Sequence, residues 1–279
     1  MSSPASPTTG QAVAADAQIT AERSETKYLV PVERSRALMG VLSTHLPAHR
    51  YRGEGENRLP GARHFITTVY FDTPTRALLR IALERPRDNL KVRVRQYYDF
   101  HPGLAEVATQ AGQLLRYQPS VWLELKRRQS ERTSKLRRQL VAGEVKSLLR
   151  GGATAAESID DSLARELADL RVELGEALRE SCVAHYQRVP FQDADGMLRV
   201  TVDFGLAFYA PAPGLWNGKG PLRPSVLGLC RAKEARVLVE VKSRAAPPPW
   251  LESALQACHA EASSYSKFVQ AGCAVHGVC

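Results

Sequence analysis

Hydrophobic and charged positions alternate in the same way in four segments of the chain. Within 89–97, apolar residues alternate with Lys91, Arg93 and Arg95. Because successive side chains of a β-strand point to opposite faces, this alternation predicts a strand with one apolar and one charged face. The pattern recurs at 121–126, 199–204 and 237–242. Charged faces of both signs on several strands are typical of a closed sheet with a polar interior and helices packed outside.

The remaining patterns predict about eight strands with interspersed helices. Leucines recur at helical spacing between Leu163 and Leu178, whereas Asp193-Ala194-Asp195-Gly196 predicts a hairpin turn. The segment 210–234, dense in Pro and Gly, predicts an irregular excursion with one short strand. Strands are predicted at 25–30, 64–72, 89–98, 120–128, 131–141, 182–191, 198–205 and 236–243, and helices at 33–46, 73–83, 143–150, 158–178, 250–258 and 264–271.

Composition defines the class of protein. Residues 1–21 are rich in Ser, Pro, Thr and Ala and predict a disordered tail, which leaves 22–279 as one domain. Hydrophobic content of 44% with 24% charged residues is ordinary for a soluble globular protein. No apolar run is long enough for a transmembrane helix and no signal peptide is evident, so we expect a cytoplasmic protein without a membrane segment. The net charge of +9 predicts an anionic partner.

The cysteines number five and show no Cys-x-x-Cys spacing. An odd count without such spacing argues against a structural zinc site and against a disulfide framework. We therefore expect reduced, incidental thiols.

The candidate chemistry lies on the charged strand faces. Nine cations and four carboxylates are predicted there, and burying so many like charges without a ligand would cost several kcal/mol per unpaired ion. A polyanion with a divalent metal resolves the conflict, since cations bind phosphate oxygens and carboxylates bind the metal. An open sheet with a solvated charged face is the alternative. The predicted charged set is Glu25, Lys27, Lys91, Arg93, Arg95, Glu124, Lys126, Lys135, Arg137, Arg188, Asp203, Glu240 and Lys242, with Tyr186 beside it.

Motifs of other enzyme classes are missing from the sequence. It has no Gly-x-x-x-x-Gly-Lys-Ser/Thr loop, no Gly-x-Gly-x-x-Gly after a strand and no Gly-x-Ser-x-Gly elbow. Phosphoryl transfer to a phosphate acceptor needs no side-chain nucleophile, only positioning and charge neutralisation.

A series of short motifs, in order along the chain, resembles the VTC domain, the polyphosphate polymerase branch of the CYTH-like triphosphate tunnel metalloenzymes. The resemblance covers about 22–279, and it is carried by the order of the motifs rather than by any single one. They are Glu25-x-Lys27-Tyr28, Tyr70-Phe71-Asp72, Lys91-Val92-Arg93-Val94-Arg95, Glu124-Leu125-Lys126, Ser134-Lys135, Tyr186-x-Arg188-x-Pro190-Phe191, Val202-Asp203, Glu240-Val241-Lys242 and Ser266-Lys267-Phe268.

The resemblance implies an α+β fold with an antiparallel, eight-stranded closed β-tunnel, flanking helices, and synthesis of polyphosphate from ATP with Mn²⁺ or Mg²⁺. It implies a metal ligand at Glu240 and polar phosphate contacts at Tyr186 and Ser266. The implied basic phosphate ligands are Lys27, Arg93, Arg95, Lys126, Lys135, Arg188 and Lys267.

Two departures from the family pattern limit which properties of the family can be expected of this chain. The wider superfamily opens with Glu-x-Glu-x-Lys, but this chain reads Arg23-x-Glu25-x-Lys27 and so lacks one metal-binding carboxylate. The inositol-phosphate-sensing domain and membrane helices of the eukaryotic proteins are also absent from the sequence, so their roles are not transferred.

The resulting hypothesis is a metal-dependent polyphosphate polymerase with ATP and inorganic polyphosphate as partners. Arg93, Arg95, Lys126 and Arg188 would hold the γ-phosphate, and product would pass Lys135 and Lys267. A tripolyphosphatase or nucleoside triphosphatase would use the same residues with water as the acceptor. A non-catalytic module that binds polyphosphate or nucleic acid is the alternative from another class. Aromatic residues at 7% offer few base-stacking platforms, which argues against nucleic acid.

Overall fold

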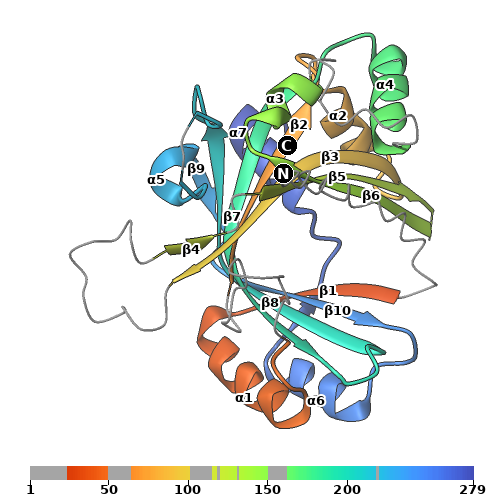
Figure 1. Ribbon diagram of the computed structural model, residues 1–279. Coiled ribbons are helices and arrows are strands. Elements are labelled where there is room, and N and C mark those ends of the chain that lie inside the picture. The colour runs from red at the N-terminus through yellow and green to blue at the C-terminus, as the bar shows by residue number, and fades with distance from the viewer. Residues whose placement is uncertain are drawn as a thin grey trace, which may run out of the picture.

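The computed structural model describes residues 24–49, 64–100, 115–117, 120–130, 132–149, 162–217 and 220–279. These residues form one antiparallel sheet with helices on its outer faces, an α+β fold (Figure 1). The predicted tail at 1–21, the loop 51–63 and most of the connection 102–118 lie outside the described residues. In chain order the strands are β1 (Ser24–Val30), β2 (His64–Asp72), β3 (Asp88–Phe100), β4 (Leu115–Tyr117), β5 (Ser120–Gln129), β6 (Arg132–Val141), β7 (Arg179–Gln192), β8 (Leu198–Pro211), β9 (Gly228–Lys233), β10 (Val237–Ser243) and β11 (Glu261–Ala262).

Two groups of helices cover the outer faces of the sheet. The helices are α1 (Ser35–His45, after the 3₁₀ turn Val32–Arg34), α2 (Ala77–Glu84), α3 (Glu144–Leu149), α4 (Ser162–Leu174), α5 (Pro224–Leu227), α6 (Pro249–Ala257) and α7 (Lys267–His276). One hydrophobic core joins α2, α3, α4 and α7 to the strands around β2, β3, β5 and β7. A second core joins α1 and α6 to β1, β8 and β10, and these helices lie below the lower strands in Figure 1.

Most predicted elements are present, with shifted ends. β2 matches its predicted range, and the irregular excursion contains the expected short strand, β9. β8 continues six residues beyond Gly205, which takes a positive φ of 58°, a conformation that glycine adopts without strain. Helix α4 ends at Leu174 rather than Leu178, because the positive φ of 64° at Gly175 turns the chain toward β7.

The prediction of a closed, eight-stranded tunnel is wrong in strand number and in closure. The described residues form a sheet of eleven strands, nine of them in the order β11-β1-β10-β8-β7-β2-β3-β5-β6. Among the described residues, the end strands β11 and β6 form no ladder with each other. The physical reason is that β11 occupies the free edge of β1 at Tyr28 and Leu29.

The sheet nevertheless curls until its two ends approach. The segment that follows β11 lies between them, because Lys27 of β1 donates to the Tyr265 carbonyl at 2.8 Å and Lys91 of β3 reaches Ser266 Oγ at 3.2 Å. Lys126 of β5 also approaches Glu25 of β1, with 3.9 Å between Nζ and Oε2. We call the face of the sheet that carries Arg93 the inner face. β1 and β10 lie opposite β3, β5 and β6 across the space enclosed by the curled sheet (Figure 1).

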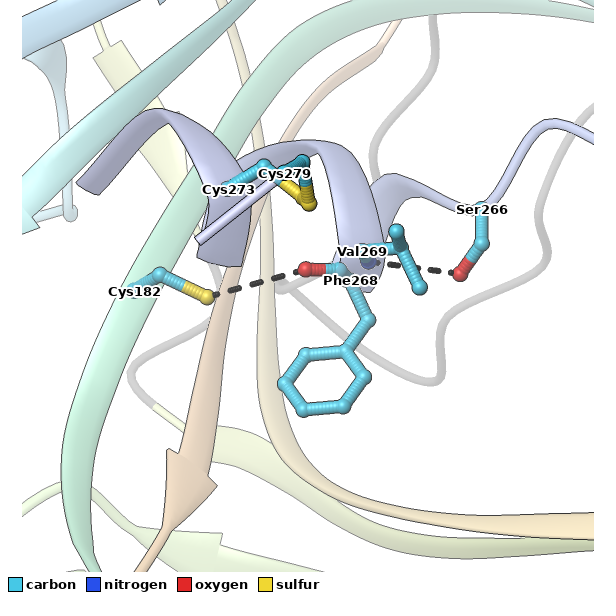
Figure 2. The surroundings of a disulfide bond; sticks show 6 residues. All are labelled: Cys182, Ser266, Phe268, Val269, Cys273 and Cys279. Carbon is cyan, nitrogen blue, oxygen red and sulfur yellow. Dashed lines mark hydrogen bonds between the residues drawn. A yellow bond between two sulfur atoms is a disulfide. The ribbon is translucent and has the colours of Figure 1, made fainter. Parts of the chain in front are cut away.

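The expectation of reduced thiols is wrong for two cysteines. Cys273 on α7 forms a disulfide with Cys279, with their Cα atoms 5.3 Å apart (Figure 2). Gly277 ends α7 in the left-handed conformation with φ 64°, so the last residues turn back toward the helix. Cys182, Cys230 and Cys258 are free.

Candidate active site

All of the side chains predicted to form the site fall on the inner face or at its rim. Their strands bring them together by register, since residues directly opposite in neighbouring strands share a face. They lie on β1 (Glu25, Lys27), β3 (Lys91, Arg93, Arg95), β5 (Glu124, Lys126), β6 (Lys135, Arg137), β7 (Tyr186, Arg188), β8 (Asp203), β10 (Glu240, Lys242) and at the start of α7 (Ser266, Lys267).

One buried carboxylate, Glu124, gathers three cations and defines the Glu124 cluster. Its Oε2 lies 2.8 Å from Arg93 Nε and 3.9 Å from Arg95 Nε, and its Oε1 lies 2.8 Å from Lys135 Nζ. Burial would raise the pKa of Glu124, but these three cations outweigh burial and lower it. Glu124 is therefore a fixed negative charge with three positive neighbours.

A second buried network, the Asp203 cluster, joins β7, β8, β10 and α7. Arg188 binds Asp203 through two hydrogen bonds of 2.6 and 2.7 Å. Lys267 lies 2.7 Å from Asp203 Oδ2 and 2.8 Å from Glu240 Oε1, and Arg188 lies 3.4 Å from Glu240 Oε2. Burial would lower the pKa of Lys267, but Asp203 and Glu240 outweigh it and raise that pKa. Lys267 is thus held as an ammonium at the start of α7.

The rim of the inner face carries a third group, the Glu25 cluster. Glu25 lies 3.3 Å from Lys242, 3.5 Å from Lys27 and 3.9 Å from Lys126. Burial would raise the pKa of Glu25, but the lysines lower it to about 2. Glu240 acts in the opposite direction on this pKa; it lies on β10 directly opposite Lys27, two residues along β1 from Glu25.

A row of like charges crosses three strands beside these clusters. Lys91, Lys126 and Lys135 are direct cross-strand partners on β3, β5 and β6. Like charges directly opposite each other destabilise a sheet. Burial and neighbouring cations lower the pKa of Lys91 to about 7. Burial also lowers the pKa of Lys126 and of Lys135, each to about 8, although Glu25 and Glu124 act in the opposite direction. An anion laid along this lysine row would stabilise all three ammonium groups.

Several buried polar atoms of the inner face have no hydrogen-bond partner among the described residues. They include Arg95 Nε and the hydroxyls of Tyr186, Thr68 and Thr201. Thr68 lies directly opposite Arg95, and Thr201 lies directly opposite Glu240. An unsatisfied buried polar group costs about 1–3 kcal/mol, so such a set indicates a surface that a polar ligand completes.

The carboxylates of the inner face offer few ligands for a divalent metal. Within the described parts of the chain, no three His, Cys, Asp or Glu side chains are arranged to hold a metal ion. Glu240 and Glu25 supply hard oxygen ligands, and Mg²⁺ is commonly bound by one or two carboxylates together with substrate phosphates. Glu240 and Glu25 are therefore the carboxylates that would hold a metal arriving with a phosphate ligand.

Three residues of the inner face were missed by the sequence analysis. Thr68, Trp122 and Thr201 are not charged, so the alternation of charges did not single them out. Each shares its strand face with a charged or aromatic residue two positions on, namely Tyr70, Glu124 and Asp203. Period-two counting alone could have found them.

Comparisons with known proteins give one family and several distant structural matches. A family model described as the VTC domain matches residues 22–276. No curated protein matches the chain. The matched range includes every residue of the three clusters, from Glu25 to Lys267.

The solved structures have low sequence identity to the chain. HpAC1 from Hippeastrum, a candidate adenylyl cyclase described as having a dominant triphosphatase activity, is 17% identical over 88% of this chain and 93% of its own, with a TM-score of 0.46. The candidate adenylate cyclase bh2851 from Bacillus halodurans is 13% identical over 86% and 88%, with a TM-score of 0.42. PH1819 from Pyrococcus horikoshii OT3 is 10% identical over 88% and 97%, with a TM-score of 0.41.

Proposed function

Because the chain belongs to the VTC domain family, we propose that it is a metal-dependent ATP:polyphosphate phosphotransferase, a polyphosphate polymerase. The substrates are ATP and inorganic polyphosphate, and the reaction transfers the γ-phosphate of ATP to the end of the growing chain. The family match supports a protein that handles phosphoryl groups, and the arrangement of the inner face supports this assignment to phosphate transfer.

The observation that carries the proposal is the lysine row beside the Glu124 cluster. Three lysines are cross-strand neighbours. One of them, Lys135, shares the single buried carboxylate of Glu124 with Arg93 and Arg95, so positive charge is in excess there. Charge-assisted hydrogen bonds from Lys and Arg to phosphate are among the strongest that proteins make. A chain of phosphates, with negative charge at every link, fits a row of cations better than a compact monoanion does.

In this proposal the residues of the inner face have separate roles in phosphoryl transfer. Arg93 and Arg95 hold the γ-phosphate from one side, with Lys126, while Arg188 holds it from the Asp203 cluster. Lys27, Lys91, Lys135, Lys242 and Lys267 neutralise the remaining phosphates, and the hydroxyls of Tyr186 and Ser266 contact phosphate oxygens. Mn²⁺ or Mg²⁺, when bound at Glu240 and Glu25, supplies further neutralisation of phosphate charge.

Electrostatic stabilisation is the largest contribution expected from this site. The attacking terminal phosphate and the γ-phosphate are both anions, so their approach is repulsive unless fixed cations flank both. In the absence of phosphate, the carboxylates Glu124, Asp203 and Glu240 hold those cations in place. Phosphate oxygens add to or replace these contacts.

The test is to incubate the purified protein with ATP and Mn²⁺ or Mg²⁺ and to size the phosphate products on a gel. We expect phosphate chains that lengthen with time, and ADP in an amount that matches the phosphate incorporated. A Glu240→Gln variant should make neither, whereas Glu252→Gln, on the exposed face of α6, should behave as wild type. Release of orthophosphate without chain growth would contradict the polymerase and would identify water as the acceptor.

A further inference from the structure

Two aromatic side chains contact cations of the inner face: Tyr186, which is fully buried under Arg188 and Lys267, and Trp122, which remains partly exposed. Trp122 is half-buried on β5, directly opposite Arg95 of β3. The guanidinium carbon of Arg137 lies over its ring, 4.6 Å from the ring centroid. The other two tryptophans serve different contacts, because Trp216 donates to Glu180 and Trp250 stacks on His45.

The register of β3, β5 and β6 places this aromatic group at a defined step along the site. Lys91, Lys126 and Lys135 form one cross-strand row, and Arg93, Glu124 and Arg137 form the next. Arg95 and Trp122 belong to the row after that. The lysine row and the Trp122 row are four residues apart along β3, roughly 13 Å at 3.3 Å per residue. A ligand extended along the strands therefore meets an aromatic end, then arginines, then lysines.

The chemistry of the two ends differs. The lysine row and the nearby Glu25 cluster offer charge alone, which suits phosphates. At the other end, the planar guanidinium of Arg137 lies over the Trp122 ring, and both side chains remain partly exposed. Together they offer flat surfaces to a π system. Stacking on aromatic side chains, with a contribution from Arg, is the common way in which proteins hold nucleobases.

We propose that Trp122 and Arg137 form the nucleobase platform of the site, so that ATP lies with its base at Trp122, its triphosphate along Arg93 and Arg95, and the polyphosphate product toward Lys91 and Lys126. This inference rests on the proposed function and adds the polarity of the substrate. Because every nucleobase has a π face, the platform accepts different nucleoside triphosphates with similar affinity.

The test compares two probes that differ in the nucleoside. Calorimetry measures the Kd of the β,γ-imido analogue of ATP and of inorganic tripolyphosphate, each with Mg²⁺, for the full chain and its variants. Trp122→Ala should raise the Kd of the nucleotide analogue about tenfold and change the Kd of tripolyphosphate less than twofold. Trp122→Phe should restore most of the loss. The matched control Trp250→Ala, at the contact of α6 with α1, should change neither Kd.

A second variant keeps the test independent of the tryptophan. Arg137→Lys preserves the charge but removes the planar group that lies over the ring. We expect weaker binding of the nucleotide analogue and little change for tripolyphosphate. Equal losses for the two probes, or an unchanged Kd for the nucleotide analogue in both variants, would overturn the platform while leaving the proposed function standing. If neither probe bound the wild-type protein, the proposed function itself would fail.

Discussion

Glu240 and Arg95 are both charged residues of the inner face, but we expect their substitution to affect activity and ligand binding in different ways. Glu240→Gln keeps the shape of the side chain and removes one negative charge beside Lys267 and Arg188. Synthesis of polyphosphate should be lost at all metal concentrations in the assay. Tripolyphosphate binding, measured by calorimetry, should persist or tighten because an anion has left the site.

Arg95→Ala should weaken binding instead. Arg95 contributes a charge-assisted contact, worth roughly 1.5–3 kcal/mol, and is held only loosely by Glu124 at 3.9 Å. We expect the Kd for tripolyphosphate to rise about tenfold or more, and the rate to fall with it. Arg93→Ala should act in the same direction, with an added loss of stability because it breaks the 2.8 Å contact to buried Glu124. Arg36→Ala, on the exposed face of α1, is the matched control.

If these residues only formed a solvated sheet face, the outcome would be different. Substitutions at such positions change the free energy of unfolding by less than about 0.5 kcal/mol and leave phosphate binding unaltered. Equal, small effects from Glu240→Gln, Arg93→Ala and Arg95→Ala would therefore contradict the account.

The lysine row makes phosphate binding depend on pH. In the free protein the pKa of Lys91 is about 7, and those of Lys126 and Lys135 are about 8. Between these values and the ordinary lysine value near 10.5, the unfolded chain binds more protons, so the free energy of unfolding rises with pH over that interval. A bound polyanion raises the three pKa values again, so binding takes up protons.

Calorimetry at pH 8.5 in buffers of different ionisation enthalpy measures this uptake. We expect a net gain of protons per tripolyphosphate, after subtraction of the ligand's own titration, and an affinity that falls as pH rises from 8 to 10. Lys91→Met should reduce the uptake. Binding without proton uptake would show that the lysines are already fully charged in the free protein.

The sequence predicts which residues face the site but not how they pair. Period-two alternation placed Arg93, Arg95 and Glu124 on charged faces, and the register brings them together. Glu124 pairs with Lys135 and Arg93, whereas Arg137 lies over Trp122. Which residues pair in this way depends on the register shifts between β3, β5 and β6. Those shifts are set by tertiary packing, and no local pattern encodes them.

At the scale of elements, long periodic segments were predictable and short ones were not. The predicted range of β2 matches the structure, and α1 and α6 lie close to theirs, because each presents a clear apolar face. β11 consists of two residues with no periodicity. It nevertheless occupies the free edge of β1, which is why closure of the sheet was predicted wrongly.

The disulfide on α7 leads to a prediction about that element alone. In the chain-entropy model, closing a loop of about seven residues stabilises the fold by about 2 kcal/mol. The bond lies at the C-terminal end of α7, whereas Lys267 begins the helix and the buried Phe268 and Ala271 anchor its first half. Reductant should therefore lower the melting temperature by several degrees and leave the Kd for tripolyphosphate unchanged.

A Cys273→Ser, Cys279→Ser double variant provides the control. Its melting temperature should equal that of the reduced wild-type protein and should not respond to reductant. A wild-type protein whose melting temperature ignores reductant would show that the bond contributes nothing to stability. A loss of phosphate affinity on reduction would show that the end of α7 is coupled to Lys267.

At the scale of the whole molecule, the charged residues behind the net charge of +9 are unevenly distributed. The inner face concentrates cations from six strands and α7 around four carboxylates, while the two hydrophobic cores lie on the opposite faces of the sheet. Within the described residues no helix is long and apolar enough to cross a membrane. Among the described residues, the inner face combines like charges that lie opposite each other with buried polar atoms that have no hydrogen-bond partner, which is an energetic conflict.

The central claim is that a polyphosphate ligand relieves this conflict, and thermal unfolding with tripolyphosphate tests it most directly. A ligand that binds only the folded protein stabilises it by about 2.7 kcal/mol at one hundred times its Kd. For a chain of this size that corresponds to a rise in melting temperature of several degrees. We predict such a rise with millimolar tripolyphosphate, a smaller one for Arg95→Ala, and none with an uncharged sugar at matched ionic strength. A melting temperature that millimolar tripolyphosphate leaves unchanged would contradict the account.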